Sequence, residues 1–299
     1  MSCALTSHML IHILERLDNL LNASLEIKGY TSLPKYSGDK PCRILNNMIK
    51  KHLIVSYVRD HYLFLDLPCG SGNDVSKLEG INVQKYVGID IDFNNFLINA
   101  AKQRPSIIAM GPKCILHKGD MCSKSLFRDL GISTGIFDVV SCQFAMHYAF
   151  ETESTATNFA DNVASALKPN GIFIATFPDC EYLLQYWKDA NGNPYTNQYV
   201  TITAPQASFT DSDEYGIKYH FKLTECVNDY EFLVRRITLE NLFRARNMHL
   251  VQNISFKDFC QDEYTPQKFK DEYGRLDEDN KQIFHIYRYA IFQKMHEYA

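Results

Sequence analysis

The sequence predicts an α/β fold built on a doubly wound, mostly parallel sheet. Short apolar runs alternate with helical segments of about ten to fifteen residues, which is typical of βαβ units. The first run, Tyr62 to Leu67, is almost continuously apolar, as expected for a central strand covered on both faces. Ligands of such sheets bind beyond the carboxyl ends of the strands. The strand candidates are residues 62–67, 86–90, 113–120, 136–143 and 171–177.

A tight glycine turn follows the first strand, within the stretch LFLDLPCGSGND. Gly70 and Gly72 let the backbone approach a ligand closely, and a helix is expected to start near Asn73. Twenty residues after Gly70, the run YVGID ends in Asp90, where nucleotide-binding units place an acid for ribose hydroxyls. Together these features predict a cofactor that contains a nucleoside.

Acidic residues around the turn favour a cationic cofactor. Asp74 stands where a dinucleotide fold has its third glycine, and its charge at a helix start would repel a pyrophosphate. S-adenosylmethionine has no phosphate, and its ammonium and sulfonium would be attracted by Asp66, Asp74 and Asp90. The alternative is a helix-capping aspartate after a turn that binds nothing.

Two domains are expected: an N-terminal helix and flexible loop at 1–42, and a main domain at 43–299. Leucines at helical spacing predict an amphipathic helix at 7–27, which packs on its own domain or on a partner. A polar, turn-rich loop at 29–41 precedes a helix from Arg43 to Val58.

The later segments are expected to add an antiparallel insertion and two further strands. Residues 180–235 break the alternation after strand five, and the runs YVTIT and KYHFKL are expected to pair there. The other predicted elements are helices at 93–103, 152–167 and 237–248, a strand at 248–256, a charged loop and helix at 259–283, and a strand at 285–294.

Composition limits the class of protein. The net charge of −4 and the pI near 6.2 exclude a globally basic nucleic-acid binder, so any RNA contact must come from a local patch. Nine cysteines without a CxxC pair provide neither a disulfide framework nor a zinc ligand set, and no metal is expected. No stretch reaches the roughly 20 apolar residues of a membrane span. A soluble, intracellular protein without membrane contact is expected.

The segment SCQFAMHYAFE, from Ser141 to Glu151, carries the most specific signal. It places Gln143, Phe144, His147 and Tyr148 at the end of strand four. Rings of this kind suit a flat base, and each base–aromatic stack contributes roughly 1–3 kcal/mol. The alternative is an aromatic core segment with a hydrogen-bonded histidine.

Several motifs resemble, in order and spacing, those of the mRNA cap guanine-N7 methyltransferases. They are NNMIK, LDLPCGSGND, YVGIDID, SCQFAMHYAFET, LKPNGIFIATFP and Glu231 in DYEFLV, and the resemblance covers about residues 43–295. It implies a Rossmann-like, class I S-adenosylmethionine-dependent methyltransferase fold with seven strands. The implied activity is methyl transfer to N7 of the cap guanine of GpppN-RNA, with the insertion at 180–235 binding the cap.

The resemblance also implies partners and locations. Capped RNA would be the substrate, other capping-enzyme domains or a stimulatory subunit would be partners, and the nucleus or cytoplasm, or a virion, would be the location. A methyltransferase for a small molecule or protein is the alternative enzyme. A non-catalytic subunit of the same fold is a third reading, although such a subunit would typically have lost Asp90 or the glycine turn.

The resemblance carries site residues over to this chain. On the cofactor side they are Lys50, Asp66, Pro68, Gly70, Asp74, Asp90, Asp120 and Gln143, and on the cap side Phe144, His147, Tyr148, Pro178, Glu231 and Tyr287. Guanine N7 has an in-plane lone pair and no proton to remove, so methylation needs alignment rather than a general base. Glu231, His147, Tyr148, Phe144 and Tyr287 are therefore expected to be catalytic only by positioning the base.

Two departures from the family pattern LGCGKGGD stand out. Pro68 replaces a glycine, and Ser71 replaces a lysine that resembles a triphosphate contact. The triphosphate is then expected to rely on other cations, namely Lys35, Lys40, Arg43 or Lys102. Such divergence is expected of a large DNA virus or a protist more than of an animal or fungus, and one module of a longer capping polypeptide would fit it.

Overall fold

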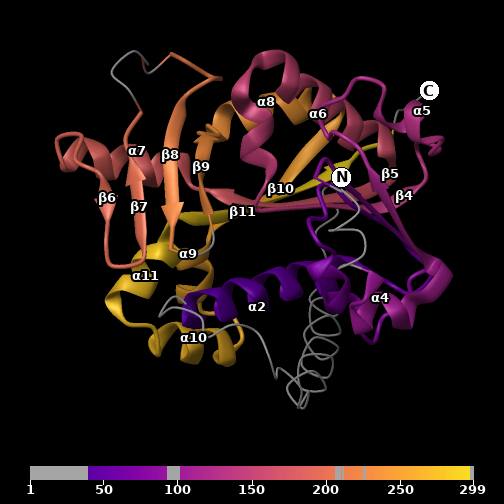
Figure 1. Ribbon diagram of the computed structural model, residues 1–299, viewed down its shortest axis with the longest axis horizontal. Coiled ribbons are helices and arrows are strands. Elements are labelled where there is room, and N and C mark those ends of the chain that lie inside the picture. Colours follow the sequence, from indigo (N-terminus) through magenta and orange to yellow (C-terminus); the bar gives the residue numbers. More distant parts are fainter. Residues whose placement is uncertain (1–39, 93–101, 206–209, 211, 225–226, 297–299) are drawn as a thin grey trace.

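The computed structural model describes residues 40–92, 102–205, 210, 212–224 and 227–296 of the chain. The expected helix at 7–27 and most of the segments 29–41 and 93–103 lie outside the described residues. Two β-sheets form the frame of the molecule, one with seven strands and one with four (Figure 1).

The seven-stranded sheet has the order β10-β11-β5-β4-β1-β2-β3. The first five strands of the chain that enter it pair in parallel, and β11 is antiparallel to both β5 and β10. This confirms the predicted mostly parallel, doubly wound sheet. The order reverses between β1 and β4, where the following loops diverge and leave room for a ligand. The strands are β1 (Leu63–Asp66), β2 (Lys85–Asp90), β3 (Cys114–Lys118), β4 (Phe137–Gln143), β5 (Leu167–Pro178), β10 (Met248–Ser255) and β11 (Tyr287–Lys294).

Helices cover both faces of this sheet (Figure 1). Neighbouring residues of a strand point to opposite faces, so Phe64 packs in the core that contains Ile49, and Leu65 in the core that contains Phe159 and Phe243. The almost continuous apolar run of β1 follows from burial on both sides. The helices are α2 (Lys40–Tyr57), α4 (Pro105–Met110), α5 (Leu126–Leu130), α6 (Glu153–Ala166), α7 (Cys180–Asp189), α8 (Arg236–Arg244), α9 (Phe256–Gln261), α10 (Gln267–Gly274) and α11 (Glu278–His285), with the short 3-10 helices η1 (Asn73–Leu78), η2 (Gly111–Lys113) and η3 (Met146–Glu151).

Side-chain caps determine where the helices beyond β4 and β5 begin. The Thr152 hydroxyl accepts a hydrogen bond from the Thr155 amide at 3.1 Å, and α6 starts on this cap. The Asp179 carboxylate accepts from the Tyr182 amide at 3.2 Å at the start of α7. Strand β5 therefore ends at Pro178, at the carboxyl edge of the sheet where the candidate site lies.

The second sheet contains β6 (Tyr195–Thr196), β7 (Val200–Thr203), β8 (Lys218–Leu223) and β9 (Val227–Phe232), all antiparallel and in that order. The antiparallel insertion after strand five is thus confirmed. In β8 the side chains of Tyr219, Phe221 and Leu223 are buried, whereas Lys218 and Lys222 are exposed. Trp187 of α7 packs against Tyr219, with ring centroids 6.1 Å apart, and so α7 covers the buried face.

Several boundaries differ from the expectation. The helix near Asn73 is only a short 3-10 helix, and β5 begins at Leu167 rather than at 171, because Leu167 pairs with Phe137 and Asn170 adopts a positive φ of 63° within the strand. Helix α7 and the strands β6 and β9 are not among the elements predicted from the sequence. Strand β9 exposes Asn228, Asp229 and Tyr230, so it lacks the alternation that identifies a half-buried strand. None of the helices in the described ranges combines the length and apolar character needed to cross a membrane.

Candidate functional site

The glycine turn after β1 is bonded to the end of β2. The Gly70 amide donates to Asp90 Oδ2 at 2.7 Å, and the other oxygen of Asp90 accepts from the Asp92 amide at 2.9 Å. Gly70 has φ +52°, and a Cβ atom built there would meet nothing within 4 Å, so the backbone is accessible to a ligand. The preceding Leu67-Pro68 peptide bond is cis. Asp90 and the turn therefore meet in space, as the twenty-residue spacing predicts.

A buried cluster of charges lies behind the turn. The Asp74 carboxylate accepts from Lys50 at 2.8 Å and contacts Lys77 at 2.7 Å. Burial disfavours the charged form, but the two ammonium groups outweigh it and hold the pKa of Asp74 below its usual range. The charge of Asp74 is thus balanced within the protein, which leaves Asp90 as the acid beside the turn itself.

Asp66, at the end of β1, has a different environment from Asp74. It is 1% exposed, Tyr86 donates to its Oδ2 at 2.7 Å, and Oδ1 has no hydrogen-bond partner among the described residues. Burial, reinforced by the nearby charge of Asp74, raises the pKa of Asp66 to about 8. Asp66 is therefore mainly protonated at neutral pH.

The end of β4 is rigidly held. The Gln143 amide donates to Ser141 at 3.0 Å and accepts from the Thr176 hydroxyl at 3.1 Å. Phe144 follows with a φ of +56°, unusual for a residue with a side chain, and its amide donates to the Thr176 carbonyl at 2.9 Å. This conformation turns the chain out of the sheet, at a cost of about 1–3 kcal/mol. Such strain is typical of functional sites.

Aromatic rings gather around Phe144. Its ring lies 4.8 Å from that of Tyr287 at an interplanar angle of 69°, and Tyr287 pairs in register with Pro178. Lys50 Nζ lies 5.5 Å from the Phe144 ring while it also contacts Asp74. Lys50 therefore links the buried charges behind the glycine turn to the aromatic group.

Glu231 reaches the same region from the second sheet. It is 4% exposed, and its Oε2 accepts a hydrogen bond of 2.5 Å from the hydroxyl of Tyr219, its register partner on β8. Its Oε1 lies 3.4 Å from His147 Nε2, and the ring of His147 packs 4.3 Å from that of Tyr148. Burial, and then the charge of Glu231, raise the pKa values of Tyr148 and Tyr219 above the usual range.

His147 is an exception to the rule that buried polar atoms are bonded. Both of its ring nitrogens are buried and have no hydrogen-bond partner among the described residues. Buried polar groups without a partner are rare in native proteins, and a bound ligand or a water molecule can satisfy them. The His147 ring, next to Glu231 Oε1, therefore offers hydrogen-bonding capacity that the described residues do not use.

The predicted site residues thus form two groups joined by Lys50: one around the glycine turn and one between β4, η3, β9 and β11. Asp120 is placed less centrally. It lies two residues beyond β3, is exposed, and accepts a local hydrogen bond from the Cys122 amide at 2.8 Å.

Of the four expected triphosphate cations, Lys35 and the side chain of Lys40 lie outside the described residues.

Sequence reasoning missed two residues of the site. Arg104 donates through Nε to the Ser71 carbonyl at 2.7 Å and through Nη2 to the Ser71 hydroxyl at 2.8 Å. A cation therefore lies beside the turn although the family lysine is absent, and only the fold brings it there. Tyr219 belongs to the run KYHFKL, where strand alternation could have marked it as buried, but its contact with Glu231 depends on the register of β8 and β9.

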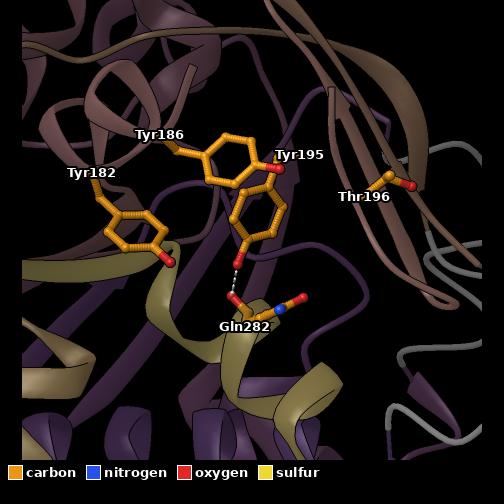
Figure 2. A pocket seen from close by; sticks show the side chains of 5 residues that line it. All are labelled: Tyr182, Tyr186, Tyr195, Thr196 and Gln282. Carbon is orange, nitrogen blue, oxygen red and sulfur yellow. Dashed lines mark hydrogen bonds between the residues drawn. The ribbon is translucent and has the colours of Figure 1, made fainter. Parts of the chain in front are cut away.

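A separate cavity of about 110 Å³ is lined by Tyr182, Tyr186, Tyr195, Thr196 and Gln282 (Figure 2). The Tyr195 hydroxyl donates to the Gln282 carbonyl at 2.6 Å, so this hydroxyl is already bonded within the protein. None of these five residues is among the predicted site residues. We therefore do not place the candidate site in this cavity.

Comparison with known proteins agrees with the resemblance. Residues 40–289 match the model of the mRNA (guanine-N(7))-methyltransferase domain. The chain is 30% identical over 246 residues to mRNA cap guanine-N(7) methyltransferase 1 of Arabidopsis thaliana, covering 78% of this chain and 65% of the relative. It is 29% identical over 286 residues to the mRNA cap guanine-N(7) methyltransferase of Saccharomyces cerevisiae, covering 86% and 64%. The chain thus spans slightly less than two thirds of these relatives.

Solved structures agree on the fold. An S-adenosylmethionine-dependent methyltransferase from Clostridium acetobutylicum superimposes with a TM-score of 0.50 at 15% identity, covering 95% of this chain and 98% of that protein. At this level of identity the likeness supports the class I methyltransferase fold and nothing finer.

Proposed function

This chain belongs to the mRNA (guanine-N(7))-methyltransferase family, and on that premise we propose that it transfers a methyl group from S-adenosylmethionine to N7 of the cap guanine of GpppN-RNA. The observation that carries the proposal is the buried pair of Glu231 and His147, in which the His147 ring has no hydrogen-bond partner among the described residues, beside the rings of Phe144, Tyr148 and Tyr287. A flat base with donors on one edge fits this combination of a carboxylate and ring faces.

The residues around the glycine turn fit the cofactor. The accessible backbone at Gly70 permits close approach, and Asp90 offers a carboxylate at the hydroxyls of a ribose. Asp66 Oδ1, buried without a partner among the described residues, is a further polar contact. When bound, S-adenosylmethionine supplies a methyl group activated by its sulfonium charge. Lys50 and Gln143 complete the cofactor side of this proposal.

On the cap side, the residues are proposed to act by positioning. Glu231 accepts from N1–H and the N2 amino group of guanine, while the rings of Phe144 and Tyr287, which contact each other edge to face, pack together on one side of the base. His147 and Tyr148 limit the rotation of the base, and Pro178, the register partner of Tyr287, lines the bottom of the cap site. Because N7 has no proton to lose, alignment is the contribution that matters, and orientation of this kind can supply roughly 7–11 kcal/mol. The carboxylate of Glu231 also stabilises positive charge that develops on the base.

We propose that the second sheet is the cap-binding insertion and that Arg104 serves the triphosphate. Its bonds to Ser71 hold a guanidinium beside the turn, where charge-assisted bonds to phosphate oxygens can form. Arg43 and Lys102, both in the described chain, remain further candidates for the same role.

A methyl-transfer assay with GpppG-capped RNA, uncapped RNA of the same sequence and free GTP tests the function. We expect incorporation into capped RNA with product N7-methylguanosine, and no incorporation into the uncapped RNA. Calorimetric titration with S-adenosylmethionine separates a catalyst from a subunit that binds nothing. Cofactor binding without methylation of any capped substrate would argue for a methyltransferase with another acceptor.

A further inference from the structure

The outer face of the second sheet is polar and basic. We define this face by Lys218, His220 and Lys222 of β8 and by Asn228 and Tyr230 of β9. In β8 these residues alternate with the buried Tyr219, Phe221 and Leu223, and the register pairs His220 with Tyr230 and Lys222 with Asn228. Alternation therefore places these five side chains together, on the side of the sheet opposite Glu231 and Tyr219.

An exposed aromatic ring lies at the centre of the face. Tyr230 is 53% exposed, Lys218 Nζ lies 4.3 Å from its ring centroid, and the ring of His220 lies 5.2 Å away at 63°. A large exposed aromatic with cationic neighbours is the combination by which proteins bind single-stranded nucleic acid, since bases stack on the ring and phosphates pair with the cations.

The charges of β9 are segregated between its two faces. Glu231 and Asp229 lie toward the cap side, where both raise the pKa of Tyr148, after the larger effect of burial. The outer face carries Lys218 and Lys222, and none of the described residues of β8 or β9 adds an acid to it. The chain as a whole has a net charge of −4, so this is a local basic patch on an acidic protein.

We propose that this outer face binds the single-stranded RNA that follows the cap, with a base stacked on Tyr230 and phosphates near Lys218 and Lys222. The proposal rests on the proposed cap methylation. Strand β9 is the edge strand of its sheet, and Tyr230 and Glu231 are consecutive residues that point to opposite faces. An RNA whose cap guanine is held at Glu231 and whose triphosphate pairs with Arg104 can return past the edge of β9 to reach Tyr230.

The test compares a cap dinucleotide with a capped RNA. Single-stranded sites span about 4–16 nucleotides, so a GpppG-capped RNA of about 20 nucleotides is long enough. For Tyr230→Ala we expect KM for the capped RNA to rise at least about fivefold, as loss of one base stack implies. KM for GpppG should stay within about twofold, and Tyr230→Phe should behave as the parent protein, because the ring is kept.

The double variant Lys218→Ala and Lys222→Ala tests the phosphate contacts. In single-stranded complexes each neutralised phosphate contributes about 0.7 to the slope of log affinity against log salt, so the slope should fall by about 1.4. Fluorescence anisotropy with labelled RNA measures it without methyl transfer. The matched control is Lys113→Ala with Arg128→Ala, two exposed cations in η2 and α5 that belong to no strand of the second sheet, and it should leave the slope unchanged.

The outcomes separate this proposal from the proposed function. In one outcome, the parent protein methylates both substrates while the Tyr230 and lysine variants leave KM and affinity for the capped RNA unchanged. That result would overturn the proposal that this face binds RNA, and cap methylation would still stand. An equal rise in KM for GpppG and for the capped RNA also overturns the proposal, because the substitution then acts on the cap pocket. If the parent methylates neither substrate, the function fails, and the anisotropy data alone decide whether this face binds RNA.

Discussion

Replacing Glu231 with glutamine is the sharpest test of guanine recognition, because it exchanges one carboxylate oxygen for an amino group at nearly constant size. Glu231 is 4% exposed, and its Oε2 accepts from Tyr219 at 2.5 Å. The Tyr219 hydroxyl can still donate to the amide oxygen of a glutamine. The new NH₂ group then takes the place of Oε1, which lies 3.4 Å from His147 Nε2. We therefore expect the variant to fold.

The expected magnitude follows from the hydrogen bonds that are lost. The N1–H and N2 amino groups of guanine would face a donor where the carboxylate accepts, and each buried donor left unpaired costs about 1–3 kcal/mol. About 1.4 kcal/mol corresponds to a tenfold change in rate. We expect kcat/KM for GpppG-capped RNA to fall about tenfold or more. The Kd for S-adenosylmethionine should stay within about twofold, because Asp90 and Gly70 belong to the other group of residues.

The assay is methyl transfer at saturating cofactor, with calorimetric titration of the cofactor and a thermal melt as a check of folding. Tyr219→Phe is the matched control: it removes the hydroxyl that donates to Glu231 but keeps the carboxylate, and should cost less activity. If the Glu231→Gln variant keeps full activity, Glu231 does not recognise guanine. An equal loss of cofactor affinity would mean that Glu231 acts through the cofactor site.

Three further predictions concern the turn after β1. Asp90→Ala should raise the Kd for S-adenosylmethionine at least about tenfold by titration, because charge-assisted bonds contribute about 1.5–3 kcal/mol each, and unchanged binding would contradict the assigned pocket. Arg104→Ala should weaken binding of the cap dinucleotide, and this loss of affinity should be smaller at high salt, where charges are screened. A loss of affinity that does not depend on salt would mean that only the shape of the turn at Ser71 had changed. Burial and then Asp74 raise the pKa of Asp66 from 3.8 to about 8, so the folded chain keeps a proton that the unfolded chain releases above about pH 4. Stability should therefore fall as pH rises toward 8, by up to about 1.4 kcal/mol per pH unit from this group. Asp66→Asn should flatten this dependence in thermal melts between about pH 5 and 8.5, and a parallel profile would count against a protonated Asp66.

The class of fold and the pairing of the glycine turn with Asp90 are predictable from the sequence alone. Both depend on local patterns: the continuous apolar run of β1 reports burial on two faces, and the spacing between Gly70 and Asp90 equals one βα unit. The antiparallel insertion was also predictable, because the alternation of β8 shows one buried face. These signals lie within a few residues or one unit of chain, so a linear reading recovers them.

The arrangement of the charges and of the second sheet around the site depends on contacts between segments that are distant in the sequence. Asp74 is balanced by Lys50 and Lys77, whereas Asp66 keeps its proton, and no pattern in the sequence distinguishes these two aspartates. Strand β9 is not predictable from the sequence, because three consecutive residues of this edge strand are exposed, and polar and apolar residues do not alternate along it. Its register with β8 sets Glu231 against Tyr219 on one face and His220 beside Tyr230 on the other. Register is fixed by packing between distant segments, because a slip of one residue would exchange the two faces.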